Sequence, residues 1–181
     1  MTAPRYLWFA PNAGLWPSFR LEHRLAQELA LDGRSVTLVH CRGLFNAFCP
    51  VMSAERLHVD SPKAAKEQAC SDCRLNSRLT AQRATYDTVY LDDVVTADVI
   101  ERARTATQSL DASNWEDFEV DGIQVGRYAS YLSMLHHKMP EVTATEQMWC
   151  EFLADVNDAL ITLWTMPKLL ERVDPTHAVV Y

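Results

Sequence analysis

The sequence predicts an α/β protein whose mostly parallel sheet is flanked by helices, and three observations carry this prediction. A short apolar run at residues 5–10, RYLWFA, ends in the loop PNAG, as a buried strand does. The next stretch has Ser18 as a helix cap, repeats apolar side chains at helical spacing and stops at Gly33. A β-branched run, SVTLVHC at residues 35–41, follows. Strand, helix and strand in this order join parallel strands, so we expect one Rossmann-like domain over residues 1–181.

The middle of the chain is less regular. We expect an irregular cysteine-bearing insertion at residues 42–80, within which a helix starts at Ser61-Pro62. A third strand is predicted at residues 87–91, and a helix capped by Thr96 follows it. The stretch WEDFEVDGIQVG alternates polar and apolar residues around Asp121, which predicts either a hairpin or an extended, lid-like segment.

Helical patterns dominate the last third of the chain. Residues 127–139, RYASYLSMLHHKM, predict one helix, and a long C-terminal helix then begins at a capping box, Thr143 to Glu146. The apolar stripe along this helix predicts that the helix packs in the core or against another domain. Pro167 is expected to kink or break this helix, and Asp174-Pro175 to end it. The sequence finishes on the strand pattern HAVVY, which leads us to expect the front part of a longer protein.

Charge and hydropathy narrow the classes of function. The formal net charge is −7, which argues against nonspecific binding to nucleic acid or to anionic membranes. No stretch reaches the ~20 apolar residues that a membrane span needs, and the N-terminus does not read as a signal peptide. We therefore expect a cytoplasmic protein without a membrane span, and the sequence leaves a homo-oligomer open.

Four of the five cysteines lie close together in the sequence, with the spacing Cys-x7-Cys-x20-Cys-x2-Cys. Cys70 and Cys73 are one helical turn apart, and Cys41 and Cys49 flank a loop that can fold back toward them. Four thiolates suit a structural zinc ion, or alternatively an iron–sulfur cluster. The other interpretation is four free thiols. A metal here would order the irregular insertion.

Four features together resemble a known family. They are the loop WFAPNAGLWPSF, the cysteine segment, the phrase VDGIQVGRYASYLSML and the strand after RVDPTHAVVY. Together they resemble the N-terminal half of bacterial polysaccharide-biosynthesis glycosyltransferases of the GT-B type. The resemblance implies two Rossmann-like domains that face each other across a cleft. The nucleotide-sugar donor would be bound mainly by a C-terminal domain missing from this sequence, and this half would bind the saccharide acceptor. The chain alone is then expected to be inactive.

Two pairs of residues are candidates for binding that acceptor. Asn12 and Gly14 follow the first strand, so they should line the crevice at the carboxyl ends of the strands. Gly14 either presents amides to a ligand or simply makes a turn. Gly126 and Arg127 either shape a loop that points a cation at a ligand, or form a turn with a solvated arginine.

Sugar transfer with inversion needs a general base for the acceptor hydroxyl. His23 and Asp121 are the main candidates, followed by His136 and His137, and each has a core or surface role as its alternative. We do not expect His136 and His137 to share a metal ion, because neighbouring residues on a helix point in different directions. The alternative function is a non-catalytic α/β binding or scaffold module whose loop is stabilised by the four-cysteine metal site.

Overall fold

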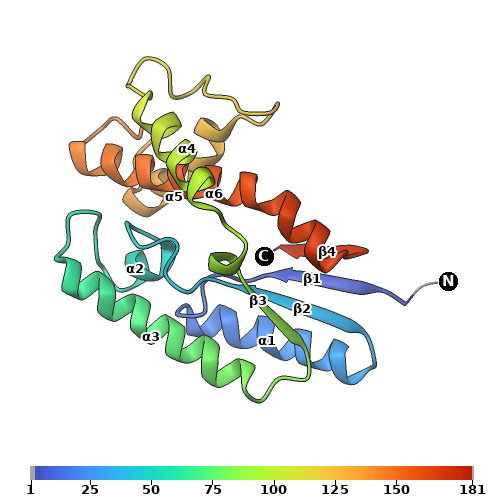
Figure 1. The fold of residues 1–181 in the computed structure, drawn as a ribbon. Helices are drawn as coiled ribbons and strands as arrows, with labels where there is room; N and C mark the ends of the chain where they lie inside the picture. The colour runs from blue at the N-terminus through green and yellow to red at the C-terminus, as the bar shows by residue number, and fades with distance from the viewer. Residues whose placement is uncertain (1–2, 181) are drawn as a thin grey trace.

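A four-stranded sheet forms the centre of the computed structural model, which describes residues 3–180 apart from the side chains of residues 16 and 17 (Figure 1). The strands are β1 Arg5–Phe9, β2 Ser35–His40, β3 Asp87–Tyr90 and β4 His177–Val180. They lie in the order β3-β2-β1-β4, and every neighbouring pair is parallel. The predicted fold class is confirmed, and this order is that of the first four strands of a Rossmann-type sheet.

Helices cover the sheet on both faces (Figure 1). On one side lie α1 Trp16–Leu31 and α3 Lys63–Ala81. On the other side α4 Ala97–Gln108 and α5 Val125–His137 pack against the long α6 Glu146–Val173. Two short elements remain, α2 Pro50–Ala54 and the 3-10 turn η1 Leu91–Asp93. No helix within residues 3–180 is long and apolar enough to cross a bilayer.

The central strands read as nearly continuous apolar runs because both of their faces are covered. In β2, every residue from Val36 to His40 is buried, and in β1 Leu7 and Trp8 are buried. Such burial on two faces is typical of a parallel sheet between helix layers, and it fixes the carboxyl ends of β1 and β2 as a rigid platform.

Two helices start at positions that differ from the prediction. The structure begins α1 at Trp16, two residues before Ser18, with a proline in its first turn. Proline suits this place because its φ is already helical and the first amides need no partner. At α6 the cap is Thr145, whose Oγ1 accepts a hydrogen bond from the backbone N–H of Met148 at 3.1 Å. Thr143 lies two residues too early to reach that amide.

Pro167 does not break α6, which runs on to Val173. The side chains two residues before and two residues after the proline, Thr165 and Leu169, are both fully buried. Packing on both sides therefore outweighs the loss of one backbone hydrogen bond. The predicted end of the helix is confirmed, since Asp174 takes a left-handed conformation with φ 47°.

The predicted hairpin around Asp121 is reduced to a tight turn. A single antiparallel bridge joins Val120 and Ile123, with both backbone hydrogen bonds at 2.9 Å. Asp121 and Gly122 occupy the turn with φ 52° and 81°. The remainder of residues 109–124 forms turns and irregular chain that leads into α5.

Candidate functional site

An open groove lies where the carboxyl end of β1 faces the helices α5 and α6. Its volume is about 490 Å³, and most of its wall is apolar. Phe9, Asn12 and Phe45 contribute from the sheet side, Tyr128 from α5, and Asp155 and Asp158 from α6. The carboxyl ends of parallel strands are where open α/β sheets bind ligands, so this groove is the first candidate for a binding site.

Two acidic side chains of the groove have strongly raised pKa values. Burial raises the pKa of Asp155 to about 7, and the negative charge of Glu151 adds to this. Burial also raises the pKa of Asp158 well above its ordinary range, against a 3.4 Å hydrogen bond from Asn157 Nδ2 that acts to lower it. Perturbed carboxyls in an apolar groove are the pattern of a general acid or base.

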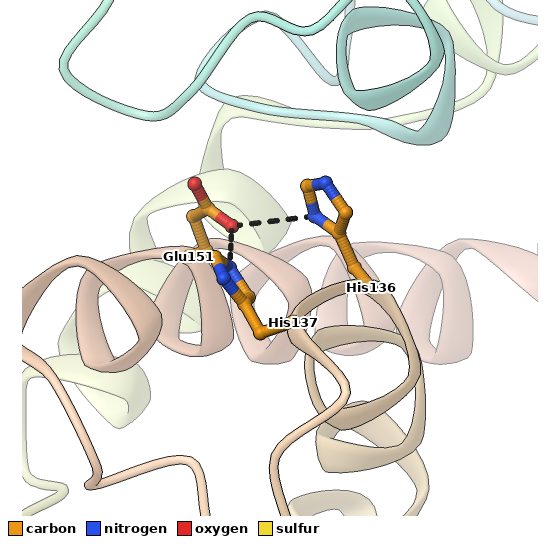
Figure 2. Close-up of side chains that lie close together, drawn as sticks. All are labelled: His136, His137 and Glu151. Atoms are coloured by element: carbon orange, nitrogen blue, oxygen red, sulfur yellow. Dashed lines mark hydrogen bonds and ion pairs between the residues drawn. The ribbon is translucent and has the colours of Figure 1, made fainter.

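Glu151 forms a second cluster one turn before Asp155, where α6 begins. Its side chain is almost completely buried, and Figure 2 shows His136 and His137 pointing toward it. His137 Nε2 lies 2.7 Å from Glu151 Oε2, and His136 Nδ1 lies 3.6 Å from the same oxygen. The three ligand atoms are all within 4.8 Å of one another, close enough to hold a metal ion.

The other carboxylate oxygen of Glu151 is held separately. His58 Nδ1 lies 3.0 Å from Oε1, and Gln147 Nε2 donates to Oε1 at 3.1 Å. Burial by itself raises the pKa of Glu151, but the hydrogen bonds from His137, Gln147 and His58 outweigh it and the pKa is lowered. Glu151 is therefore an ionised carboxylate in the interior, balanced by polar neighbours.

The rings of His136 and His137 face the same carboxylate oxygen, although we did not expect these two residues to share a metal ion. Their rings are 4.7 Å apart, although the residues are neighbours in the chain. His136 uses Nδ1, close to its backbone, whereas His137 uses the distal Nε2, so the two rings reach the same oxygen from different directions. The helix also ends here, since Lys138 takes a left-handed conformation with φ 54°.

The four clustered cysteines line one small cavity beside the loop that follows β1. The volume of this cavity is about 20 Å³, and its wall includes Cys41, Cys49, Cys70 and Cys73. All five cysteines of the chain are free thiols. Within residues 3–180 the cysteine sulfur atoms do not gather as tightly as the ligand atoms of the histidine cluster. The fold thus brings both predicted cysteine pairs to one cavity, although their sulfur atoms do not converge on a single point.

Two of these sulfur atoms accept backbone hydrogen bonds, and burial raises the pKa values of the thiols. The backbone N–H of Gly14 donates to Cys73 Sγ at 3.1 Å, and that of Gly43 donates to Cys41 Sγ at 3.2 Å. Burial raises the pKa of Cys49 to about 12 and that of Cys73 to about 11, so both thiols are protonated near neutral pH. A metal ion would have to displace those protons to bind.

Of the residues predicted to bind substrate, Asn12 lines both the groove and the cysteine cavity. Gly14 is packed tightly, because an added Cβ would lie 2.5 Å from a methyl carbon of Val51 and 3.3 Å from the Cβ of Cys73. Gly126 is tighter still and leaves no room for a side chain against the Trp115 backbone.

The predicted bases His23 and Asp121 lie elsewhere in the fold. His23 bonds through Nδ1 to the hydroxyl of Tyr86 at 2.5 Å, and burial lowers its pKa. Asp121 is exposed in its turn, and Arg127 is exposed on the first turn of α5. None of the three is among the residues that line the groove. The groove carboxyls Asp155 and Asp158 went unpredicted, although acidic residues within an apolar helical stripe are a usable signal.

Comparisons of the chain with models of protein families, with curated proteins and with solved structures found no match. The groove, the cysteine cavity and the histidine cluster are the features on which a function can be based.

Proposed function

We propose that this chain is the acceptor-binding, Rossmann-like domain of a GT-B glycosyltransferase in polysaccharide biosynthesis. The observation that supports this most is the groove at the carboxyl end of β1, where two carboxyls of raised pKa face an apolar and aromatic wall. Sugar rings have flat apolar faces and hydroxyl edges. Phe9, Phe45 and Tyr128 suit the faces, and Asp155 and Asp158 suit the hydroxyls.

In the proposed reaction, Asp155 is the general base. The acceptor hydroxyl gives its proton to the carboxylate of Asp155 while the hydroxyl oxygen attacks the anomeric carbon of the donor sugar. A new C–O bond forms with inversion, the bond to the nucleotide diphosphate breaks, and the nucleotide leaves with that electron pair. A pKa of about 7 suits this role, because the group is then partly ionised at neutral pH and still basic enough to take a proton. The nucleotide-sugar donor would be held by a second domain.

Saccharide binding to this chain tests the proposal. Isotope-labelled protein is titrated with a panel of oligosaccharides and followed by NMR. We expect shifts at groove residues, and Asp155→Asn should weaken binding by about tenfold through the loss of a charged hydrogen bond. Glu171→Gln, an exposed change on the same helix, is the matched control. Absence of binding to the whole panel, or equal affinity for both variants, would refute acceptor binding at this groove.

A second candidate function is a non-catalytic binding or scaffold module. One observation favours it: α5 exposes large apolar side chains, with Tyr128 73% exposed, Tyr131 66% and Leu135 61%. Such a face suits contact with another protein. The form that can be tested directly is self-association, by sedimentation of the wild type and of Tyr131→Glu. A concentration-dependent dimer that the substitution disperses would favour this candidate, and a monomer in both cases would count against it.

We also propose that Cys41, Cys49, Cys70 and Cys73 bind one structural zinc ion. A cavity of about 20 Å³ has room for about one water-sized particle, which suits a single ion better than an iron–sulfur cluster. The ion would draw the sulfur atoms inward to Zn–S bonds of about 2.3 Å and release the thiol protons. The reduced thiols that this requires persist in the cytoplasm, where we place the protein.

Metal analysis of protein purified without oxygen tests the cysteine site. Colourless protein with about one thiolate-bound zinc per chain supports it, and Cys73→Ser should lose that zinc. Brown protein that contains iron and sulfide would instead indicate an iron–sulfur cluster. If Cys73→Ser kept the metal content of the wild type, the proposed cysteine site would be refuted.

A further inference from the structure

We infer that His136, His137 and Glu151 form a second metal site, which binds a divalent transition-metal ion and zinc in the first place. This site is separate from the cysteine cavity and from the groove, and it does not depend on the proposed glycosyl transfer. It joins the end of α5 to the start of α6, two helices that pack closely together (Figure 2).

The geometry is close to that of a tetrahedral ion. Two ligands with zinc bonds of about 2.0–2.1 Å lie roughly 3.4 Å apart. The nitrogen atoms of His137 and His136 lie 2.7 and 3.6 Å from Glu151 Oε2. One distance is shorter than that value and the other is slightly longer, and all three ligand atoms lie within 4.8 Å of one another. The ion would sit between the two rings and Oε2.

The carboxylate of Glu151 is already oriented for such an ion. Its Oε1 atom is taken up by His58 and Gln147 at 3.0 and 3.1 Å, so Oε2 is the oxygen that remains for a metal. Metal-binding carboxylates are commonly fixed in this way by a hydrogen bond on their second oxygen. His58 and Gln147 are therefore positioning residues, not ligands.

Three imidazoles surround the single carboxylate of the cluster. The nitrogen atoms of His58, His136 and His137 lie 3.0, 3.6 and 2.7 Å from its two oxygen atoms. An imidazole nitrogen that carries no proton offers its lone pair to a metal ion. Around Oε1, His58 Nδ1 also lies 2.6 Å from Gln147 Nε2, so no assignment of protons satisfies all three contacts at once.

Two imidazole nitrogens and one carboxylate oxygen select the class of ion. This donor set suits Zn²⁺ and related ions such as Co²⁺ or Fe²⁺, whereas Ca²⁺ and Mg²⁺ prefer oxygen ligands only. Three protein ligands leave one position open for water. The ion can reach the site from solvent, because the side chain of His136 is 31% exposed while that of Glu151 is 1% exposed.

Cobalt titration of the metal-free chain tests this inference, because the spectrum separates the two kinds of site. Co²⁺ on thiolates gives intense sulfur-to-metal bands in the near ultraviolet, and Co²⁺ on nitrogen and oxygen gives only weak visible bands. We expect a nitrogen–oxygen site in the wild type. His136→Ala should weaken it by at least about tenfold, while Cys73→Ser leaves it unchanged. His177→Ala, a change at an exposed histidine on β4, is the matched control.

A second readout needs no substitution and therefore does not depend on whether a variant folds. NMR of the histidine rings on addition of Zn²⁺ to wild-type protein should shift the signals of His136 and His137 and leave those of His177 in place. Zinc that moves none of these ring signals, or cobalt bands of equal strength in His136→Ala and the wild type, would overturn the inference. A failure of saccharide to bind in the groove would not affect this inference, because the two sites are separate.

Discussion

His40 is fully buried at the carboxyl end of β2 and is kept neutral there. Its Nδ1–H donates to the carbonyl of Ala10 at 3.1 Å, and its Nε2 has no hydrogen-bond partner among the described residues. Burial lowers the pKa of His40 to about 4, and the nearby His23 acts in the same direction, against the hydrogen bond to Ala10. A proton on this ring is therefore far less favourable in the folded protein than in the unfolded chain.

We predict that His40 destabilises the fold as the pH falls from about 6.5 to about 4. In that window the unfolded chain takes up a proton that the folded protein refuses, so the free energy of unfolding decreases, by about 3 kcal/mol at most. Urea unfolding of wild type and His40→Gln at several pH values measures this as a widening difference. His177→Gln is the exposed control. A difference that stays constant between pH 7 and 4.5 would contradict the buried, neutral state.

Asp155 should have the opposite pH dependence. Its folded pKa of about 7 lies above its ordinary value, so the folded protein holds this proton more tightly than the unfolded chain does. The stabilising effect is complete below about pH 4 and is lost as the pH rises to about 7. We predict that Asp155→Asn gains stability relative to the wild type over this window, as measured by urea unfolding. A gain of the same size at pH 4.5 and 8 would argue against a raised pKa.

At the scale of elements, α5 is docked through its first turn. A Cβ on Gly126 would lie 1.8 Å from the carbonyl oxygen of Trp115 and 3.4 Å from the Cβ of Phe118. The backbone N–H of Gly126 also donates to the carbonyl of Phe118 at 3.1 Å. Close backbone approach therefore explains this glycine without any ligand.

We predict that Gly126→Ala lowers the free energy of unfolding by about 3 kcal/mol, because the turn at residues 115–118 must move away from α5. The neighbouring exposed change Arg127→Ala should alter it by less than about 0.5 kcal/mol. Thermal and urea unfolding of both variants make the comparison. If Arg127→Ala were the more damaging change, the docking of α5 would need another explanation.

Pro167 in α6 offers a test with the opposite sign. A proline inside a helix removes one backbone hydrogen bond and crowds the preceding turn, and this one is exposed at the surface. Pro167→Ala should therefore stabilise the protein, by up to about 3 kcal/mol, in thermal or urea unfolding. Lys168→Ala is the exposed control on the same turn. A loss of stability in Pro167→Ala would mean that contacts of the proline ring itself are worth more than the missing hydrogen bond.

Local patterns predicted most of the elements because each depends on a few neighbouring residues. The first two strands, the start of α3 at Pro62, the Thr96 cap and the end of α6 at Asp174 follow from apolar runs and capping residues alone. Packing overrules a local rule where α6 continues through Pro167, and the helix cap lies two residues after the predicted Thr143.

The candidate sites were harder to predict because they depend on how helices pack. The cysteines were found from spacing, and the structure does place all four at one cavity. Asp155 and Glu151 acquire their surroundings only when α6 lies against α5 and the sheet, and no pattern within α6 reveals what will face it. His136 was judged by the direction in which it leaves the helix, whereas its ring reaches Glu151 through Nδ1.

At the scale of the whole molecule, one connecting segment, residues 42–62, contacts both proposed metal sites. Cys49 lies within it and faces the cysteine cavity, while His58 reaches Glu151 on the other side. Lys66 fastens it further, since its Nζ donates to the carbonyls of Ala47 and Val59 at 3.0 and 2.7 Å. The segment has little regular secondary structure, so these few contacts determine how well its conformation is ordered.

We predict that loss of the cysteine-bound ion releases this segment while the sheet stays folded. Cys73→Ser, or treatment with a chelator, should speed protease cleavage within residues 42–62 by about tenfold or more, because cleavage follows local opening. Cys150→Ser, outside the cavity, is the control. Mass spectrometry of the first fragments locates the cut. First cuts at the same sites and rates in all three proteins would contradict a tie through Cys73.

The spacing of acidic groups along α6 has one more consequence. Glu151 and Asp155 are a single turn apart, about 6 Å along the axis, and the charge of Glu151 helps to keep the proton on Asp155. A doubly positive ion on Glu151 would reverse the local field and make Asp155 a stronger acid. Binding of an ion at the histidine cluster would thus shift the ionisation of Asp155 toward lower pH, and one helix would couple the supply of a cation to the ionisation of the neighbouring base in the groove.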